Sequence, residues 1–255
     1  MSMVDFKLLE ENFYLTLHAP ENAMLTIPAL DLLKFERMEE LIDMYGSLIK
    51  ARERSTAAAF FMSWYAGVCG AMQHMLYRDC TQLLDLSLSN ITVQLYAGEH
   101  YPFFLFTIVE MRFTKSLDKD RMEGHKQLLD FFYREHVTPL IQTLSQTADI
   151  HVIPLWGQII NALYPQLQEE LAEASDEASR TKINEYFQML TYDMEASAFG
   201  LHKNPFVIKQ THIEHPTIPE QKVFIKAACC LAYSLDHEIS YCYECPRLKK
   251  RIGLQ

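Results

Sequence analysis

Apolar residues recur at helical spacing along much of the chain, which predicts a mainly helical protein. From Phe35 onward, one face of an amphipathic helix is marked by Met38, Leu41, Ile42, Tyr45, Leu48 and Ile49. A second helix is predicted from Ser55 or Thr56 to about Tyr77, with apolar residues around most of its circumference. A helix that is apolar on nearly all sides is a buried one, so we expect this helix inside the protein.

Elsewhere the pattern predicts a hairpin and further helices. Ile91, Val93 and Leu95 alternate with other residues, 97–100 resembles a turn, and 101–109 is apolar and aromatic, as in an antiparallel hairpin. A short strand is predicted within 12–18, and helices near 128–144, 153–171 and 183–194. Pro139 is expected to kink or break the first of these helices near Thr138. We therefore predict an α+β fold, predominantly helical, with a small antiparallel sheet.

Composition narrows the class of protein. A chain of 255 residues with 49% hydrophobic and 22% charged residues can bury a sizeable core. We expect a helix-rich body over 1–220 and a C-terminal segment over 221–255, forming one continuous domain. The net charge of −10 argues against nucleic-acid binding. No apolar run is long enough for stable membrane insertion, and no signal peptide precedes the first acidic residues, so we expect a cytoplasmic location.

Four of the six cysteines lie near the C-terminus: Cys229, Cys230, Cys242 and Cys245. A C-x-x-C pair can turn two sulfurs toward one metal, and thiolates suit zinc and iron–sulfur centres. An adjacent pair in a straight strand points to opposite faces, so it needs a bend to bind one metal but can serve two iron atoms without one. The spacing alone fits zinc and iron–sulfur equally. A disulfide is disfavoured in the cytosol, and a chance grouping of free thiols is a poorer explanation.

The order Cys-Cys, spacer, Cys-x-x-Cys-Pro resembles the ferric-iron reductase (FhuF-like) family. The spacer here has eleven residues, Leu231 to Tyr241, one more than the family pattern. Pro139-Leu140 and the stretch Ile-Pro-Leu-Trp-Gly-Gln at 153–158 are similar to the family's central Pro-Leu and Trp-Gly-Asn motifs, with Gln158 in place of Asn. Arg54-Ser55 before the long helix also resembles this family and related siderophore synthetases. The resemblance covers about the C-terminal two-thirds of the chain.

The resemblance implies an oxidoreductase with a 2Fe–2S cluster on the four cysteines. Members of the family are cytoplasmic reductases of ferric siderophores, so the implied reaction is one-electron reduction of chelated Fe(III), with release of Fe(II) for iron assimilation. A siderophore holds ferric far better than ferrous iron, so this chemistry needs no acid–base pair. The sequence has neither a G-x-G-x-x-G nor a Walker-type loop. We therefore expect an external electron donor: a ferredoxin, a flavin or a flavoprotein.

Candidate substrate-binding residues are Arg52, Arg54, His74 and Arg78, because their donors suit the charged oxygens of a siderophore. Taken singly, each is also explained as an ordinary surface or helix-end charge.

Basic residues after the last cysteine are candidates for tuning the cluster. Arg247, Lys249 and Lys250 would favour the more negative reduced state and raise the reduction potential, although a solvated basic terminus explains them equally well. Two alternatives to a reductase remain at this stage. One is a non-enzymatic binding protein stabilised by zinc on the same cysteines, and the other is a siderophore-binding relative without redox activity.

Overall fold

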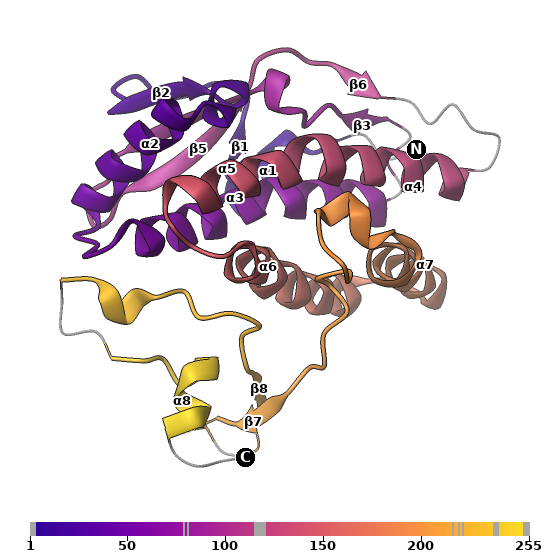
Figure 1. Ribbon diagram of the computed structural model, residues 1–255. Helices are drawn as coiled ribbons and strands as arrows, with labels where there is room; N and C mark the ends of the chain where they lie inside the picture. Colours follow the sequence, from indigo (N-terminus) through magenta and orange to yellow (C-terminus); the bar gives the residue numbers. More distant parts are fainter. Residues whose placement is uncertain are drawn as a thin grey trace.

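The computed structural model describes residues 4–78, 80, 82–114, 121–215, 217–218, 220, 222–236 and 240–251. Its α-helices are α1 (Phe6–Phe13), α2 (Phe35–Leu48), α3 (Arg54–Tyr77), α4 (Arg121–Phe132), α5 (Thr138–Thr147), α6 (Val152–Glu173), α7 (Glu177–Gln188) and α8 (Pro246–Arg251). Its strands are β1 (Leu15–Thr16), β2 (Leu25–Pro28), β3 (Leu83–Leu84), β4 (Ile91–Tyr96), β5 (Phe103–Ile108), β6 (Phe113–Thr114), β7 (His212–Glu214) and β8 (Lys222–Phe224). The predominantly helical α+β class is confirmed (Figure 1).

The main sheet has the strand order β1-β5-β4-β2. The predicted hairpin is confirmed: β4 and β5 pair antiparallel, with Ile91 opposite Ile108. The sheet is mixed rather than purely antiparallel, because β1 pairs parallel to β5. The predicted strand at 12–18 is reduced to β1, since α1 runs to Phe13 and ends at Tyr14, which has the left-handed φ of 59°. Parallel pairing suits strands that are far apart in sequence, as these two are.

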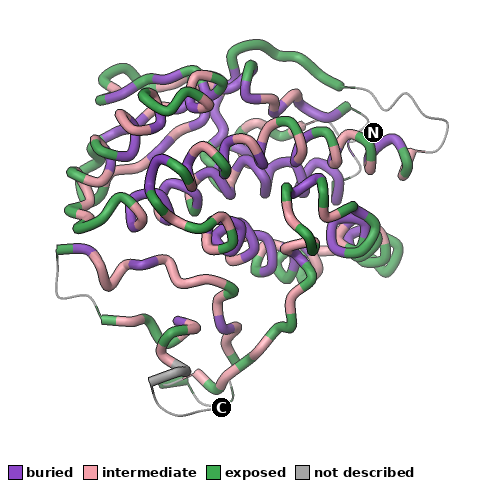
Figure 2. The backbone as a smooth tube through the Cα atoms, in the orientation of Figure 1, coloured by how far each residue is buried: buried purple, intermediate pink, exposed green. Residues whose placement is uncertain are grey.

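Helix α3 lies at the centre of the protein, as its apolar circumference predicts. It packs against α1, α2, α6 and α7 and against the sheet. On the sheet side, the ring of Phe61 lies 5.2 Å from that of Phe104, and the ring of Tyr65 lies 5.6 Å from that of Phe106. Figure 2 shows α3 as a nearly continuous buried stretch. Helix α3 is therefore the central element, against which the sheet and helices α1, α2, α6 and α7 pack.

The helix predicted around 128–144 is divided, as Pro139 suggests. Helix α4 ends at Phe132, a π-helical turn follows over Tyr133–Val137, and α5 begins at Thr138. Pro139 lies in the first turn of α5. Val137 and Thr138 keep right-handed helical φ and ψ, so the chain stays helical up to Pro139, and the wider π-helical turn before it accommodates a residue that has no N–H to donate.

We call residues 4–206 the helical body and residues 207–251 the C-terminal segment. Phe206 is the last fully buried member of the main core. Beyond it, the described chain forms only the β7–β8 hairpin, a short 3₁₀ turn and α8, and most of its residues are exposed or half-buried (Figures 1 and 2). Among the described helices, none has both the length and the apolar character needed to span a bilayer.

Candidate metal-cluster site

The four C-terminal cysteines lie in one neighbourhood of the C-terminal segment. The Sγ atoms of Cys229 and Cys245 are 3.4 Å apart. Beyond the main effect of burial, Cys230 contributes to the raised pKa of both Cys229 and Cys242, and Cys245 contributes to that of Cys242. Cys245 is buried, Cys229 and Cys230 are half-buried and Cys242 is exposed. The two predicted cysteine pairs are therefore brought together at the surface of the protein.

The backbone bends next to each cysteine pair. Leu231 adopts a left-handed φ of 64°, and its N–H donates to the Sγ of Cys229 over 3.4 Å. The N–H of Cys245 donates to the carbonyl of Cys242 over 3.0 Å, which closes the turn of the C-x-x-C pair. These two bends allow sulfurs from separate loops to meet. An amide hydrogen bond to a ligand sulfur is also one of the means by which a protein tunes an iron–sulfur centre.

The donor set fits a metal centre built from pairs of thiolates. Two thiolates on one tetrahedral metal, at about 2.3 Å from it, lie about 3.8 Å apart, which is close to the Cys229–Cys245 separation of 3.4 Å. Within the described part of the chain, no three Cys, His, Asp or Glu side chains converge on one point. The arrangement thus places one pair at ligand spacing and the other two thiols nearby.

The four C-terminal cysteines are free thiols. Burial raises the pKa of the Cys229 thiol to about 11, with contributions from Cys245 and Cys230, while the hydrogen bond from Leu231 opposes the rise. Burial also raises the pKa of Cys242, and Lys226 opposes it. Because metals bind the thiolate, metal binding here must release protons.

Helix α6 holds the first cysteine pair in place through side-chain amides. Asn161 accepts from the N–H of Ala227 over 2.7 Å and donates to the carbonyl of Ala228 over 2.9 Å. Gln158 donates to the carbonyl of Cys229 over 3.1 Å. Three consecutive residues are thus fixed to one face of a long helix. Asn161 has no distinguishing sequence signal, because its role depends on which loop the fold brings to it.

Gly157 allows this close approach. A Cβ atom at position 157 would lie 2.2 Å from the Cβ of Ala228, well inside contact distance. The neighbouring Trp156 is buried against Phe199 and Phe206, and these contacts hold α6 in position within the core. The Trp-Gly-Gln stretch therefore positions the first cysteine pair.

The spacer between the cysteine pairs is attached to the loop before α3. Ala51 and Leu235 form an antiparallel bridge, the N–H of Arg52 donates to Ser234 over 3.1 Å, and the N–H of Asp236 donates to Lys50 over 2.8 Å. These contacts hold the spacer against the body at a second place.

Comparison with known proteins adds no further constraint. No protein-family model and no curated protein matches this chain. The resemblance to ferric-iron reductases therefore depends on the sequence motifs alone: the cysteine tail, residues 153–158, Pro139-Leu140 and Arg54-Ser55. The first two of these stretches are in contact in the fold.

The four candidate substrate-binding residues do not form one face. Arg52 lies beside the spacer, 3.4 Å from Asp236. Arg54 donates twice to Asp43 over 2.6 Å, and Asp43 and Glu39 raise the pKa of its guanidinium, so its donors are engaged within the body.

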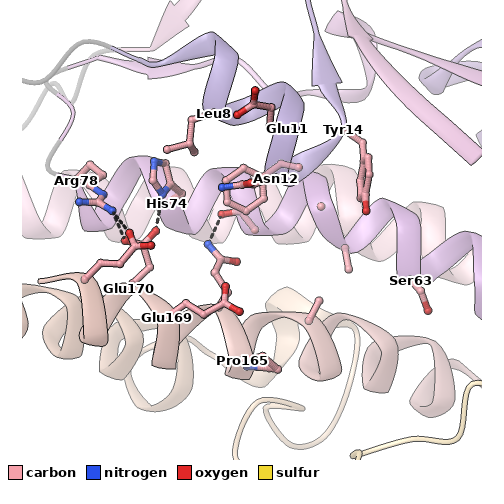
Figure 3. A pocket seen from close by; sticks show the side chains of 17 residues that line it. Leu8, Glu11, Asn12, Tyr14, Ser63, His74, Arg78, Pro165, Glu169 and Glu170 are labelled. Atoms are coloured by element: carbon pink, nitrogen blue, oxygen red, sulfur yellow. Dashed lines mark hydrogen bonds and ion pairs between the residues drawn. The ribbon is translucent and has the colours of Figure 1, made fainter.

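His74 and Arg78 lie at the other end of α3, about 30 Å and about 36 Å from Arg54 at 1.5 Å per residue. The Nδ1 atom of His74 is 2.5 Å from Glu170, and Arg78 is 3.1 Å from the other oxygen of that carboxylate. Figure 3 shows both side chains directed at Glu170. His74 and Arg78, at the carboxyl end of α3, are therefore not part of the site around the cysteines.

Two basic side chains accompany the thiols. Arg247, one of the predicted tuning residues, interacts electrostatically with Cys229, hydrogen-bonds to the hydroxyl of Tyr233 and lies 5.2 Å from the centre of its ring. The side chains of Lys249 and Lys250 lie outside the described part of the structure. Lys226, which the sequence did not single out, has its Nζ atom 3.9 Å from the Sγ of Cys242 and 3.0 Å from Glu244.

Proposed function

We propose that this protein is a cytoplasmic ferric-chelate reductase, which holds a 2Fe–2S cluster on Cys229, Cys230, Cys242 and Cys245. It reduces a ferric siderophore by one electron and releases Fe(II) for iron assimilation. The observation that carries the proposal is the meeting of the two cysteine pairs, with the sulfurs of Cys229 and Cys245 only 3.4 Å apart. When bound, the cluster supplies a single electron at a time.

The arrangement of the thiols favours a two-iron centre over a single zinc ion. One zinc needs four sulfurs around a single point. In the described residues, only one pair of sulfurs has ligand spacing, and no third ligand joins it. A 2Fe–2S cluster takes two thiolates on each iron and so needs two pairs rather than one tight group. Cys229 with Cys245 supplies one pair, and we propose that Cys230 and Cys242 supply the other.

The surrounding residues favour reduction and electron exit. Lys226 and Arg247 bring positive charge to Cys242 and Cys229, which stabilises the more negative reduced state, while Glu244 reduces the effect. Cys242 is exposed, so the site reaches the surface where a bulky chelate can approach. The sequence lacks a nucleotide-binding loop, and we infer that a ferredoxin, a flavin or a flavoprotein delivers the electron.

Spectroscopy and metal analysis of anaerobically purified protein test the proposal. We expect reddish-brown protein with iron and sulfide in equal amounts, bleached by dithionite, and Cys242→Ser should lose both colour and sulfide. Cys69→Ala is the matched control, because Cys69 is buried in α3 away from the site. A colourless protein containing zinc would overturn the cluster assignment.

Activity is tested separately from cluster content. Dithionite-reduced protein, freed of excess reductant, is mixed with ferric siderophores and a chromophoric ferrous trap. We expect trapped Fe(II) in proportion to the cluster oxidised. An intact cluster that releases no Fe(II) from hydroxamate, citrate or catecholate complexes would leave a binding protein and not a reductase.

A further inference from the structure

A cavity of about 680 Å³ lies between α1, α3 and α6 (Figure 3). It follows α3 from Ser63 to Arg78, a distance of about 22 Å at 1.5 Å per residue. This volume is within the usual range of about 300–1,000 Å³ for small-molecule sites. Its described lining residues all belong to the helical body. A ligand in this cavity would therefore occupy a site separate from the cysteine loops.

We propose that this cavity binds an aliphatic polyamine, a flexible chain of methylene groups that carries several ammonium groups. The site is independent of the cysteines and of the proposed reductase activity. Three features of the cavity walls carry the inference: an excess of carboxylates, a buried histidine with one free ring nitrogen, and aromatic side chains along the rest of the cavity.

The end of the cavity near Arg78 is electronegative. Helix α6 lines it with three carboxylates, those of Glu169, Glu170 and Glu173. Arg78 lies 3.1 Å from Glu170 and 3.0 Å from Glu173. Glu169 has neither an ion pair nor a hydrogen bond with any residue that the structure describes. At this end the carboxylates therefore exceed the guanidinium by two negative charges, and one of them is free to bind a cation.

The helix dipoles add to this negative potential. Helices α3 and α6 run parallel, because Ser63 hydrogen-bonds to Gln158 and, further along both helices, His74 contacts Glu170. The carboxyl ends of both helices therefore lie at the same end of the cavity. The carboxyl end of a helix carries a partial negative charge that favours cations.

His74 offers a free acceptor inside the cavity. It is only 8% exposed, and its Nδ1 atom is held 2.5 Å from Glu170. Because a carboxylate only accepts hydrogen bonds, Nδ1 is the donor, and the Nε2 atom of the neutral ring is an acceptor. Nε2 has no hydrogen-bond partner among the described residues and is not enclosed by protein atoms, so it faces the cavity. An ammonium N–H would supply the missing donor.

The spacing of the acceptors favours an organic cation over a metal ion. A metal ion needs several ligands around one point. In the part of the chain that the structure describes, no three Cys, His, Asp or Glu side chains converge in that way. The acceptors instead follow one another along the cavity. Gln166, one turn before Glu169, donates to the carbonyl of Gly70 over 2.9 Å and leaves its own amide oxygen for a ligand.

Aromatic side chains line the rest of the cavity. The ring of Phe13 lies 5.5 Å from that of His74, and Tyr14 lies toward Ser63 (Figure 3). The ring of Tyr14 packs edge-on against Trp64, with 4.6 Å between the ring centres. Aromatic rings attract cations and pack against methylene groups. The cavity thus offers acceptors for ammonium groups and an apolar surface for the chain that joins them.

Equilibrium dialysis of the full chain against labelled spermidine tests binding. At about 0.15 M salt, which screens diffuse attraction to an acidic surface, we expect saturable binding of about one spermidine per chain. Choline, a cation without N–H donors, should bind at least about tenfold more weakly. Mg²⁺ at the same concentration as spermidine should not displace it. Absence of saturable binding, equal affinity for choline, or displacement by Mg²⁺ would overturn the inference.

Substitutions locate the site. His74→Asn keeps an N–H donor for Glu170 and removes Nε2, and should weaken spermidine binding about tenfold. Glu169→Gln should weaken it about threefold. Glu169 is exposed and unpaired in the described structure, so this variant should fold normally. Glu185→Gln on α7 makes the same charge change outside the cavity and should bind normally. Normal binding by both cavity variants, or equal weakening by Glu185→Gln, would show that spermidine does not occupy this cavity.

The cysteines provide a further control. Cys242→Ser should lose the proposed cluster and still bind spermidine as the unsubstituted chain does. Loss of spermidine binding in this variant would place the amine at the cysteine loops and overturn the inference. Spermidine binding with the expected dependence on His74 and Glu169, in a protein that assembles no cluster, would support this site while the reductase proposal fails.

Discussion

In the helical body, one continuous core surrounds α3, whereas the C-terminal segment buries little apolar surface. The described residues of the segment contribute only four buried apolar side chains, Ile225, Leu231, Leu235 and Cys245, and none of them belongs to the main core. In Figure 2, the interior of the helical body is coloured mostly as buried, whereas the C-terminal segment is coloured mostly as exposed or half-buried. The body is therefore stabilised by burial of apolar surface, and the segment by hydrogen bonds and, we propose, by its cluster.

This difference separates the tasks of the two regions. The body supplies a face on α6 that fixes residues 227–229, and the segment carries the cysteines that we propose as cluster ligands. Because the metal-free segment has little core of its own, the free energy of binding the proposed cluster would act largely as folding free energy of the segment. The two regions should consequently respond differently to the same perturbation.

The largest effect is expected from Trp156→Ala. Trp156 is buried and its ring lies 6.0 Å from that of Tyr133 and 5.4 Å from that of Phe199. Truncation should lower the free energy of unfolding of the body by about 3–5 kcal/mol. Urea unfolding followed by circular dichroism measures this change. Tyr192→Ala, at a 73% exposed position, is the control and should change stability little. A loss below about 1 kcal/mol for Trp156→Ala would contradict the description of the core.

Removal of the cluster should affect only the segment. After iron is withdrawn with a chelator under reducing conditions, amide hydrogen exchange over 225–235 should accelerate at least about a hundredfold, a change of about 2.8 kcal/mol in local stability. Exchange in α3 should stay as slow as before. Equal acceleration in both regions would show that the body depends on the metal, and the comparison would no longer hold.

The contrast also explains which features the sequence predicted. Helices α2, α3 and α6 and the β4–β5 hairpin have strong local periodicity, and their positions are confirmed within a few residues. The parallel pairing of β1 with β5 is set by contacts between distant parts of the chain, which periodicity does not encode. Helix α1 is a short element of eight residues, and the sequence pattern did not indicate it.

In the candidate site, too, residues brought in by contacts between distant parts of the chain could not be predicted from the sequence. The cysteines are recognisable because their chemistry is specific, and their spacing indicated a bend at the C-x-x-C pair but left open whether the adjacent pair bends or stays straight. Asn161 and Lys226 became relevant only when α6 and β8 were placed beside the cysteine loops. Arg54 and His74 have the right chemistry for a siderophore, but carboxylates on other helices, Asp43 on α2 and Glu170 on α6, already engage them.

A smaller effect, confined to the junction of the two regions, is expected from Gly157→Ala. The new methyl group would overlap Ala228, and overpacking of this kind costs about 1–3 kcal/mol. The segment has less buried apolar surface than the body, so the segment should move away while α6 remains helical. The ratio of iron to protein should then fall. Gly46→Ala in α2 is the matched control, since its new Cβ would be 3.4 Å from Ala57, an ordinary contact. Full iron occupancy in Gly157→Ala would show that the segment does not need this close approach.

The smallest effect, and the sharpest in sign, is expected from Asn161→Ala. The substitution removes the hydrogen bonds to Ala227 and Ala228, which should weaken the segment by about 1–2 kcal/mol. Alanine is the better helix former, so α6 and the body should gain about 0.5 kcal/mol. Hydrogen exchange over 225–231 should therefore become faster while the midpoint of urea unfolding rises slightly. Asn184→Ala in α7 removes only a bond to the carbonyl of Arg180 in the same helix and should leave the segment unchanged. If both regions weaken together in Asn161→Ala, they form one cooperative unit and the hydrogen bonds of Asn161 support the body as much as the segment.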